Sequence, residues 1–172
     1  MADGYVVEAI MSGKRNELIA VDLSGAKLQY VDLHGVNLSG ANLNSADLHG
    51  ADLSDVNLSK VDLRSADLFG AKLIRANLSD AKLGGADLGG ADLNSVNLRS
   101  VNLSKVNLDA ADLRNGNLSY AFLLNVNLRK VNFDGADLSY AKLGGAKLSG
   151  VVLKRANLSF VDLRNVKLTG AD

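Results

Sequence analysis

The chain of 172 residues contains no cysteine and no proline, and its nineteen basic residues balance nineteen acidic ones. Without cysteine there is no disulfide, no thiolate nucleophile and no cysteine metal site. The absence of proline suits a fold in which nearly every backbone N–H donates to a ladder, because proline cannot donate. A net charge of zero provides no overall field that would draw the chain to nucleic acid or to an anionic membrane.

Long hydrophobic runs are missing as well. No apolar stretch approaches the roughly 20 residues that span a bilayer. Glu8 interrupts the apolar run Val6–Met11 near the start, so a secretory signal is not expected. We therefore expect a soluble, cytoplasmic protein that binds neither a membrane nor, directly, nucleic acid.

What the chain does contain is a fixed repeat of five residues. Leucine occupies every fifth position from Leu23 to Leu168, with Phe133 as the exception, and an alanine or valine lies two residues before each, except at Gly116. An α-helix would spread these leucines around its axis, and a flat strand would send them to alternate faces. A chain that bends after every unit can direct both residues toward a common axis. The repeat therefore predicts an all-β solenoid.

A second period, of 20 residues, predicts the number of units in a coil. Among the seven units taken every fourth from Leu38 to Leu158, asparagine precedes the leucine in six and serine follows it in six. Among the remaining units, asparagine precedes the leucine in only five of 24. We therefore predict a four-sided coil with about 7.6 coils over residues 21–172, stacked about 4.8 Å apart. Stacked asparagines would bond amide to amide along the axis.

Units such as Ala41-Asn42-Leu43-Asn44-Ser45 follow the pattern A-[DN]-L-x-x, which resembles the pentapeptide-repeat family over about 150 of the 172 residues. The resemblance implies a right-handed quadrilateral β-helix, and its handedness comes from the family rather than from the spacing. Cyanobacterial members are similar in having a short helix before the coils and a stretch like Gly13-Lys14-Arg15-Asn16. The residue before the leucine is sometimes not Asp or Asn, and we expect that outward position to be tolerant.

The two ends of the chain lie outside the full coils. We expect residues 1–20 to form an N-terminal cap, with a short helix that begins after Asp3, continues to about Met11 and stops at Gly13. Such a helix would cover the first coil, as solenoid ends require. The other end stops in mid-coil at Asp172, which leaves backbone N–H and C=O groups unpaired. A C-terminal end-to-end homodimer, a trimmed chain or a frayed partial coil would each account for it.

No catalytic constellation emerges from the residues. His34 and His49 are predicted to point outward on different faces, and pairs such as Asp52 and Asp55 lie outside the rod with no cleft to shift a pKa. Glycine pairs such as Gly84-Gly85 lack the strand–turn–helix context of a phosphate loop. We therefore expect no enzyme activity, no metal and no cofactor.

The exposed charges are distributed unevenly. The face of Leu33, Leu53 and Leu73 carries seven aspartates and five basic residues, whereas residues 139–172 contain six Lys or Arg and two Asp. Mixed, solvated faces are the plain interpretation. A basic end that binds an acidic partner is the alternative.

The candidate partner-binding residues are apolar. Tyr120, Tyr140 and Phe160 are 20 residues apart, which places them at one corner of three successive coils, and Phe122 and Leu124 occupy outward positions that are usually polar. Such a cluster is typical of an interaction site. An aromatic ladder that stabilises coil stacking is the structural alternative. It explains the three corner rings but not Phe122 and Leu124.

These observations favour a non-catalytic protein-interaction scaffold or regulator, a rigid rod that binds an unknown protein partner through its side faces. A regulator of cyanobacterial cell differentiation would be a subtype. The resemblance also implies an alternative, a DNA-mimicking inhibitor of DNA gyrase of the quinolone-protection type. A net charge of zero and coils without interrupting loops argue against that alternative.

Overall fold

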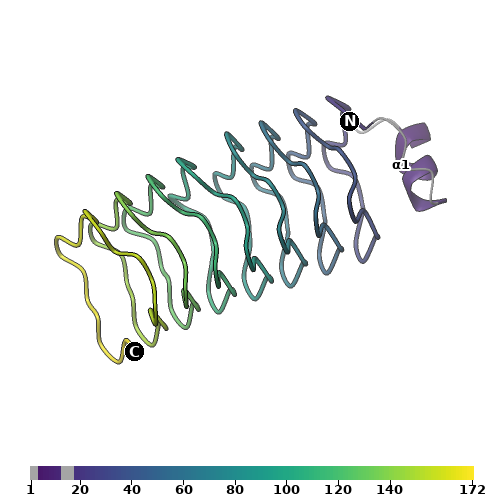
Figure 1. Cartoon of the computed structure of the whole chain (residues 1–172). Helices are drawn as coiled ribbons and strands as arrows, with labels where there is room; N and C mark the ends of the chain where they lie inside the picture. The colour runs from purple at the N-terminus through teal and green to yellow at the C-terminus, as the bar shows by residue number, and fades with distance from the viewer. Residues whose placement is uncertain (1–3, 13–17) are drawn as a thin grey trace.

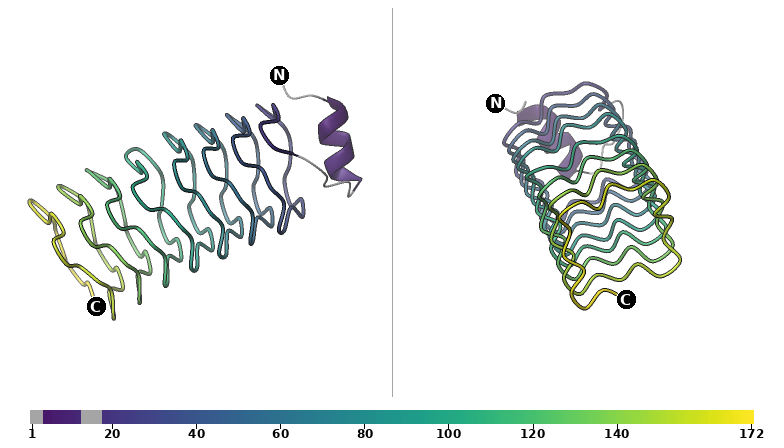
Figure 2. Two further views of the ribbon diagram at one scale, coloured as in Figure 1. Left: turned by 45° about the horizontal axis from the view of Figure 1, so that its top comes forward. Right: turned by 90° about the vertical axis from the view of Figure 1, so that its left-hand side faces the viewer.

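The computed structural model describes residues 4–12 and 18–172. A short helix, α1 (Gly4–Met11), precedes a rod of stacked coils, and the N- and C-terminal ends of the described chain lie at opposite ends of the rod (Figure 1). Viewed from the C-terminal end, the coils superimpose on one four-sided outline (Figure 2).

Backbone pairing confirms the period of 20 residues. Each parallel bridge from residue 22 onward joins a residue to the one 20 positions later, as in Asn57 with Asn77. At this rung Leu58 N donates to Asn77 O at 2.8 Å, and Asn77 N donates to Val56 O at 3.0 Å. Each side of a coil is thus a very short strand that pairs through the residue before the leucine. Four five-residue repeats make one coil, as the sequence predicted.

The core is continuous along the rod and consists of four stacked columns of leucines with smaller residues between them. The repeat leucines from Leu23 to Leu148, and Phe133 among them, are at most 2% exposed. The prediction that both repeat positions face a common axis is therefore confirmed for these coils. Burial decreases in the last coil, where Leu163 is 38% and Leu168 is 48% exposed. The end-to-end homodimer that would cover them remains a prediction.

The preference for Asp or Asn before each leucine has a cause that sequence analysis missed. In most repeats this side chain accepts a hydrogen bond from the backbone N–H two residues later, as in Ser59 N to Asn57 Oδ1 at 3.1 Å. Such local bonds are the reason that Asp and Asn favour turns. The predicted amide-to-amide contact also occurs, with Asn97 Nδ2 donating to Asn77 Oδ1 at 3.0 Å. The position is therefore outward but has a structural role, turning the chain toward its next corner.

The second residue after each leucine forms the corner and has a left-handed backbone. Its φ is positive at eleven glycines and at twenty residues that are not glycine. An L residue in this region costs about 1–2 kcal/mol relative to a right-handed conformation. The corners thus hold large side chains, such as Tyr120 (φ 61°) and Phe160 (φ 59°), in a conformation that the neighbouring coils impose.

Helix α1 contacts the core through its apolar side. Ile10 is 2% exposed and belongs to the core cluster, and the half-buried Val7 packs against it. The predicted helix start at Asp3, its stop at Gly13 and the stretch Gly13–Asn16 lie outside the described residues. The role of the helix as a cap remains a prediction. None of the helices in the described part of the chain is long and apolar enough to cross a membrane.

The acidic face predicted around Leu33, Leu53 and Leu73 is largely neutralised by ion pairs along it. All five of its basic residues lie within 4 Å of an aspartate on the same face, at distances of 2.5–3.7 Å: Lys72 with Asp52, Arg75 with Asp55, Arg114 with Asp112, Lys154 with Asp172 and Arg155 with Asp134. These side chains are solvent-exposed, so each pair contributes little to stability. Their main effect is to remove free charge from this face.

Hydrogen bonds from arginine lower the pKa of several of the aspartates. The side chain of Arg164 donates to both carboxylate oxygens of Asp162, at 2.9 and 2.8 Å, and its backbone N–H donates to the same group. These bonds lower the pKa of Asp162 from 3.8 to about 2. The pKa of Asp55 is lowered in the same direction, first by the hydrogen bond from Arg75.

The strained corners predict a gain in stability from glycine. Ala110→Gly should raise the free energy of unfolding by about 0.5–1 kcal/mol, because φ at Ala110 is 57° and glycine adopts this conformation without a steric penalty. The neighbouring Ala111 is 1% exposed, so Ala111→Gly should instead lower it by about 1–2 kcal/mol through loss of a buried methyl group and added chain entropy. Denaturant unfolding of both variants measures this. Changes of the same sign would contradict the assignment of strain to the corner.

The lowered pKa of Asp162 predicts a loss of stability in acid. The folded chain binds this proton more weakly than the unfolded chain, so the contribution is complete above pH 3.8 and is lost as the pH falls to about 2. Asp162→Asn keeps an oxygen for the backbone N–H but removes the charge, so its melting temperature should fall less over this range. Asp80→Asn, at a corner without an ion pair in the described chain, serves as the control and should follow the wild type. An equal fall in the Asp162 variant would show that this ion pair does not matter.

Candidate functional site

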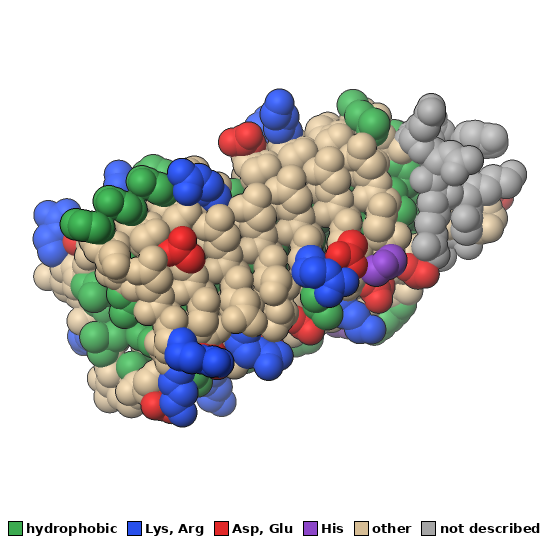
Figure 3. Space-filling view, viewed as in Figure 1, with side chains coloured by type: hydrophobic (Ala, Val, Ile, Leu, Met, Phe, Trp, Pro, Cys, Tyr) green, Lys and Arg blue, Asp and Glu red, His purple; other side chains and the backbone are tan. Residues whose placement is uncertain are grey.

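Three aromatic rings form a continuous stack along one corner of the rod. The ring centroids of Tyr120 and Tyr140 lie 4.8 Å apart at an interplanar angle of 2°, and those of Tyr140 and Phe160 lie 4.8 Å apart at 11°. The spacing equals the separation of coils in a β-ladder. The rings are nevertheless 42%, 44% and 77% exposed, in chain order. Figure 3 shows hydrophobic side chains in a row along this edge toward the C-terminal end.

A cation continues the stack at its N-terminal side. The guanidinium carbon of Arg99 lies 4.8 Å from the centroid of the Tyr120 ring, and Arg99 Nη1 donates to Ser119 Oγ at 3.0 Å. A guanidinium above an aromatic face is held by the charge distribution of the ring. Arg99 was not among the predicted residues, although its place one coil before Ser119 and Tyr120 could have indicated the contact.

Phe122 lies next to the stack, on the adjoining side of the coil. Its backbone pairs with Lys142 of the next coil, and Lys142 Nζ lies 4.7 Å from the centroid of the Phe122 ring. Phe122 is half-buried rather than fully outward. The ammonium group of Lys142 thus lies over the ring of Phe122.

Leu124 lies farther along the same side, beyond Leu123. It is 40% exposed, and its Cδ2 approaches the backbone at Gly144, where an added Cβ would lie 3.4 Å away. It lines a shallow groove of about 310 Å³ that also contains Asp162 and Arg164. We use the term aromatic corner for Tyr120, Phe122, Leu124, Tyr140 and Phe160. Leu124 forms its far border, next to an ion pair.

Sequence analysis missed a second aromatic cluster near the other end of the rod. The ring of His49 lies 5.4 Å from that of Tyr30, edge to face, and 5.5 Å from that of Phe69, stacked at 8°. The 20-residue offset between His49 and Phe69 could have revealed it. His34 lies on another face, with Nε2 3.7 Å from Asp55 Oδ2. Both histidines therefore have neighbours on the surface, and they lie apart from one another.

A groove on the outer side of the last coils was also missed. It has a volume of about 450 Å³ and is lined by three basic side chains, by polar and small residues and by the apolar Ala146 and Leu148. The basic side chains are those of Arg129, Lys147 and Lys167. None of the described residues that line it is acidic. In the part of the chain that the structure describes, no group of three or more His, Asp or Glu is arranged to hold a metal ion.

Exposed rings with cations at their borders characterise the aromatic corner. Its rings are exposed, ordered by stacking and bordered by the cations Arg99 and Lys142. Aromatic and arginine side chains are enriched at the centres of protein interfaces. The predicted stacking of Tyr120, Tyr140 and Phe160 is observed. It does not explain why Leu124 is exposed.

Comparisons with known proteins agree with the coil geometry. The family described as pentapeptide repeats (8 copies) matches residues 17–55, 46–85, 71–115, 107–139 and 132–170. A comparison with curated proteins gave no match. The match implies that the quadrilateral coil is right-handed.

Solved structures of the same kind resemble the chain. HetL, a pentapeptide repeat protein involved in heterocyst differentiation regulation from the cyanobacterium Nostoc sp. strain PCC 7120, is 32% identical, with 99% of this chain and 96% of that chain covered and a TM-score of 0.38. Rfr23 from the cyanobacterium Cyanothece 51142 is 20% identical, with 96% and 95% covered and a TM-score of 0.27. QnrB1, a plasmid-mediated fluoroquinolone resistance protein, is 23% identical in one trypsin-treated form, with 90% and 79% covered and a TM-score of 0.46.

The repeat pattern, the pairing of each residue with the one 20 positions later and a family match that extends from residue 17 to residue 170 lead to one conclusion. The chain belongs to the pentapeptide-repeat family.

Proposed function

We propose that this protein is a non-catalytic, cytoplasmic interaction scaffold that binds a protein partner through the aromatic corner. The observation that carries the proposal is the stack of three exposed, parallel rings at Tyr120, Tyr140 and Phe160. A monomeric protein seldom exposes large apolar groups in a contiguous row without a binding role.

Rigidity of the corner supports binding. Each ring is attached to a backbone that is hydrogen-bonded to the next coil, as in Tyr120 N to Ser139 O and Tyr140 N to Ser159 O, both at 2.9 Å. Stacking restricts the side chains further. Ordering flexible side chains costs about 0.5–1.5 kcal/mol each on association, and here much of that ordering exists before the partner arrives.

The borders of the corner indicate the partner's chemistry. Arg99 and Lys142 place positive charge on two sides of the apolar groups, and neither makes an ion pair with a described residue. Electrostatic complementarity contributes to specificity and to the rate of association. A partner segment with aliphatic or aromatic side chains and flanking carboxylates therefore fits best.

A DNA-mimicking inhibitor of DNA gyrase is the alternative. Mimicry of duplex DNA requires rows of unpaired negative charge, whereas arginine or lysine neutralises most aspartates around Leu33, Leu53 and Leu73. The charge pattern thus favours the scaffold, and the partner that is recovered decides between the two.

The double substitution Phe122→Asp with Leu124→Asp should abolish partner binding and change the free energy of unfolding by only about 1 kcal/mol, because both side chains lie outside the core. Pull-down from a lysate of the source organism, with mass spectrometry, measures binding, and thermal melting measures stability. Phe69→Asp is the matched control, since Phe69 is an exposed ring (49%) of the other aromatic cluster. This control should retain the partner.

A second variant tests whether the ring of Phe160 contacts the partner, without adding strain to the backbone. Phe160 has φ 59°, so Phe160→Gly removes the most exposed ring at a position that glycine tolerates. We expect weaker binding without loss of stability. Retention of the same partner by all these variants would refute the site. A large loss of stability in the double variant would instead make Phe122 and Leu124 structural, and recovery of gyrase would favour the alternative function.

A further inference from the structure

Nine of the 17 described Lys and Arg side chains contact a carboxylate or an aromatic ring of the chain itself. Among the described arginines, all except Arg129 contact a carboxylate or an aromatic ring: Arg64 with Asp62, Arg75 with Asp55, Arg99 with Tyr120, Arg114 with Asp112, Arg155 with Asp134 and Arg164 with Asp162. The basic excess predicted for residues 139–172 is reduced in the same way, since Lys142, Lys154, Arg155 and Arg164 have such partners. Within that segment Lys147 and Lys167 remain.

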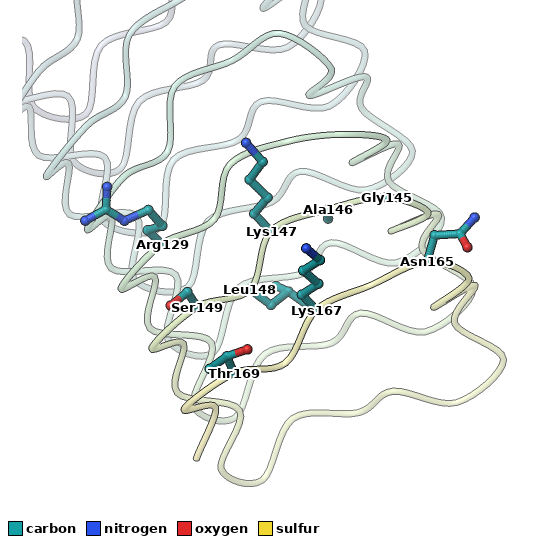
Figure 4. A pocket seen from close by; sticks show the side chains of 9 residues that line it. All are labelled: Arg129, Gly145, Ala146, Lys147, Leu148, Ser149, Asn165, Lys167 and Thr169. Carbon is teal, nitrogen blue, oxygen red and sulfur yellow. The ribbon is translucent and has the colours of Figure 1, made fainter.

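Three of the unpaired cations, Arg129, Lys147 and Lys167, line the groove of about 450 Å³ on the last coils, which we call the basic groove. Lys147 and Lys167 pair through their backbones on neighbouring coils, and all three side chains are exposed without an ion pair in the described chain. Figure 4 shows the two lysines extending in the same direction, with Ser149 and Thr169 one above the other beside them. Arg129 lies at one edge of the groove and Asn165 at the other.

The spacing of these groups follows from the coil. Neighbouring coils are about 4.8 Å apart, and Ser149 and Thr169, in the turns that follow the leucines, come two residues after Lys147 and Lys167. Lys147, Ser149, Lys167 and Thr169 therefore form a two-by-two array of hydrogen-bond donors. Both ammonium groups and both hydroxyl groups can reach one small ligand placed over the array.

The other three sides of the last coils do not have this composition. Each carries an aspartate at a corresponding outward position: Asp137, Asp162 and Asp172. Asp137 accepts a hydrogen bond from Asn157 Nδ2 at 3.0 Å. Asp162 forms an ion pair with Arg164 Nη2 at 2.8 Å, and Asp172 forms one with Lys154 Nζ at 2.7 Å. On the side of the basic groove, the described residues of the last two coils carry Lys147, Ser149, Lys167 and Thr169 and no carboxylate.

We propose that the basic groove is a binding site for a phosphate group. Two adjacent lysines supply the charge that a phosphate dianion requires, and the hydroxyls of Ser149 and Thr169 supply donors for its remaining oxygens. A single carboxylate has one charge and two oxygens, so it uses the array less completely. The lysines and hydroxyls of this site are not part of the aromatic corner, although the groove beside Leu124 shares Gly145 and Asn165 with the basic groove.

Titration with inorganic phosphate at constant ionic strength, followed by amide NMR shifts, tests the proposal. We expect saturable shifts at residues 147–149 and 167–169. Lys147→Gln with Lys167→Gln should weaken binding by at least about tenfold, because two charge-assisted hydrogen bonds are lost. Lys147→Arg with Lys167→Arg should retain it.

The matched control is Lys60→Gln with Lys82→Gln, which removes the same charge from two lysines that are also unpaired within residues 4–12 and 18–172 but lie outside the basic groove. It should bind phosphate like the wild type. Equal weakening in the control, or the same shifts with chloride at matched ionic strength, would show only a general charge effect and would overturn the proposal. Equal affinity for acetate would overturn its preference for phosphate.

Further arms distinguish the source of the phosphate. O-phosphoserine represents a protein-borne phosphate, and vesicles of phosphatidylcholine with phosphatidic acid represent a lipid headgroup. Saturable binding of free phosphate or phosphoserine that depends on Lys147 and Lys167 supports a soluble or protein-borne source. Binding to vesicles alone with the same dependence supports a headgroup. Binding in none of the arms would contradict the site.

Discussion

The structure depends on burying two residues of every five, a leucine and a small neighbour, in one narrow core. Because the chain bends at each corner, Leu58 and Val56 reach the axis while Asn57 stays outside and pairs with Asn77 one coil later. The backbone bonds and the core therefore impose the same period on one another. A residue inserted into one repeat would move every later leucine off the axis, which explains why the register continues without interruption from Leu23 to Leu168.

Because the inward positions are fixed by core packing, the outward positions are the ones that can vary with function. The corner residue must accept a positive φ, and the residue before the leucine usually bonds the backbone two residues on, but side chains as different as Tyr120, Lys60 and Gly40 form corners. Function on such a rod arises where one kind of side chain recurs on consecutive coils. We propose two such places, the aromatic corner and the basic groove, on different sides of the C-terminal half.

The coil could be predicted from the sequence because its period is carried by many residues, whereas each surface site depends on a few. The recurrence of asparagine before every fourth leucine predicted the 20-residue coil, and the stack of Tyr120 on Tyr140 followed from the same period. The contact of Arg99 with Tyr120 and the freedom of Lys147 could not be predicted in this way, because they depend on which neighbours a long side chain reaches. The net charge of residues 139–172 does not distinguish cations that form ion pairs from cations that do not, so it did not locate the basic groove.

The most direct test of this account is the axial distance between side chains that share a column. Ser39 and Ser159 are separated by six coils and Ser79 and Ser159 by four, and since the chain has no cysteine, Ser→Cys variants accept spin labels at these positions alone. Double electron–electron resonance should give mean distances of about 29 Å and about 19 Å, a difference of two coil spacings. Distances that do not increase by about 10 Å from the four-coil to the six-coil pair would contradict the four-sided coil.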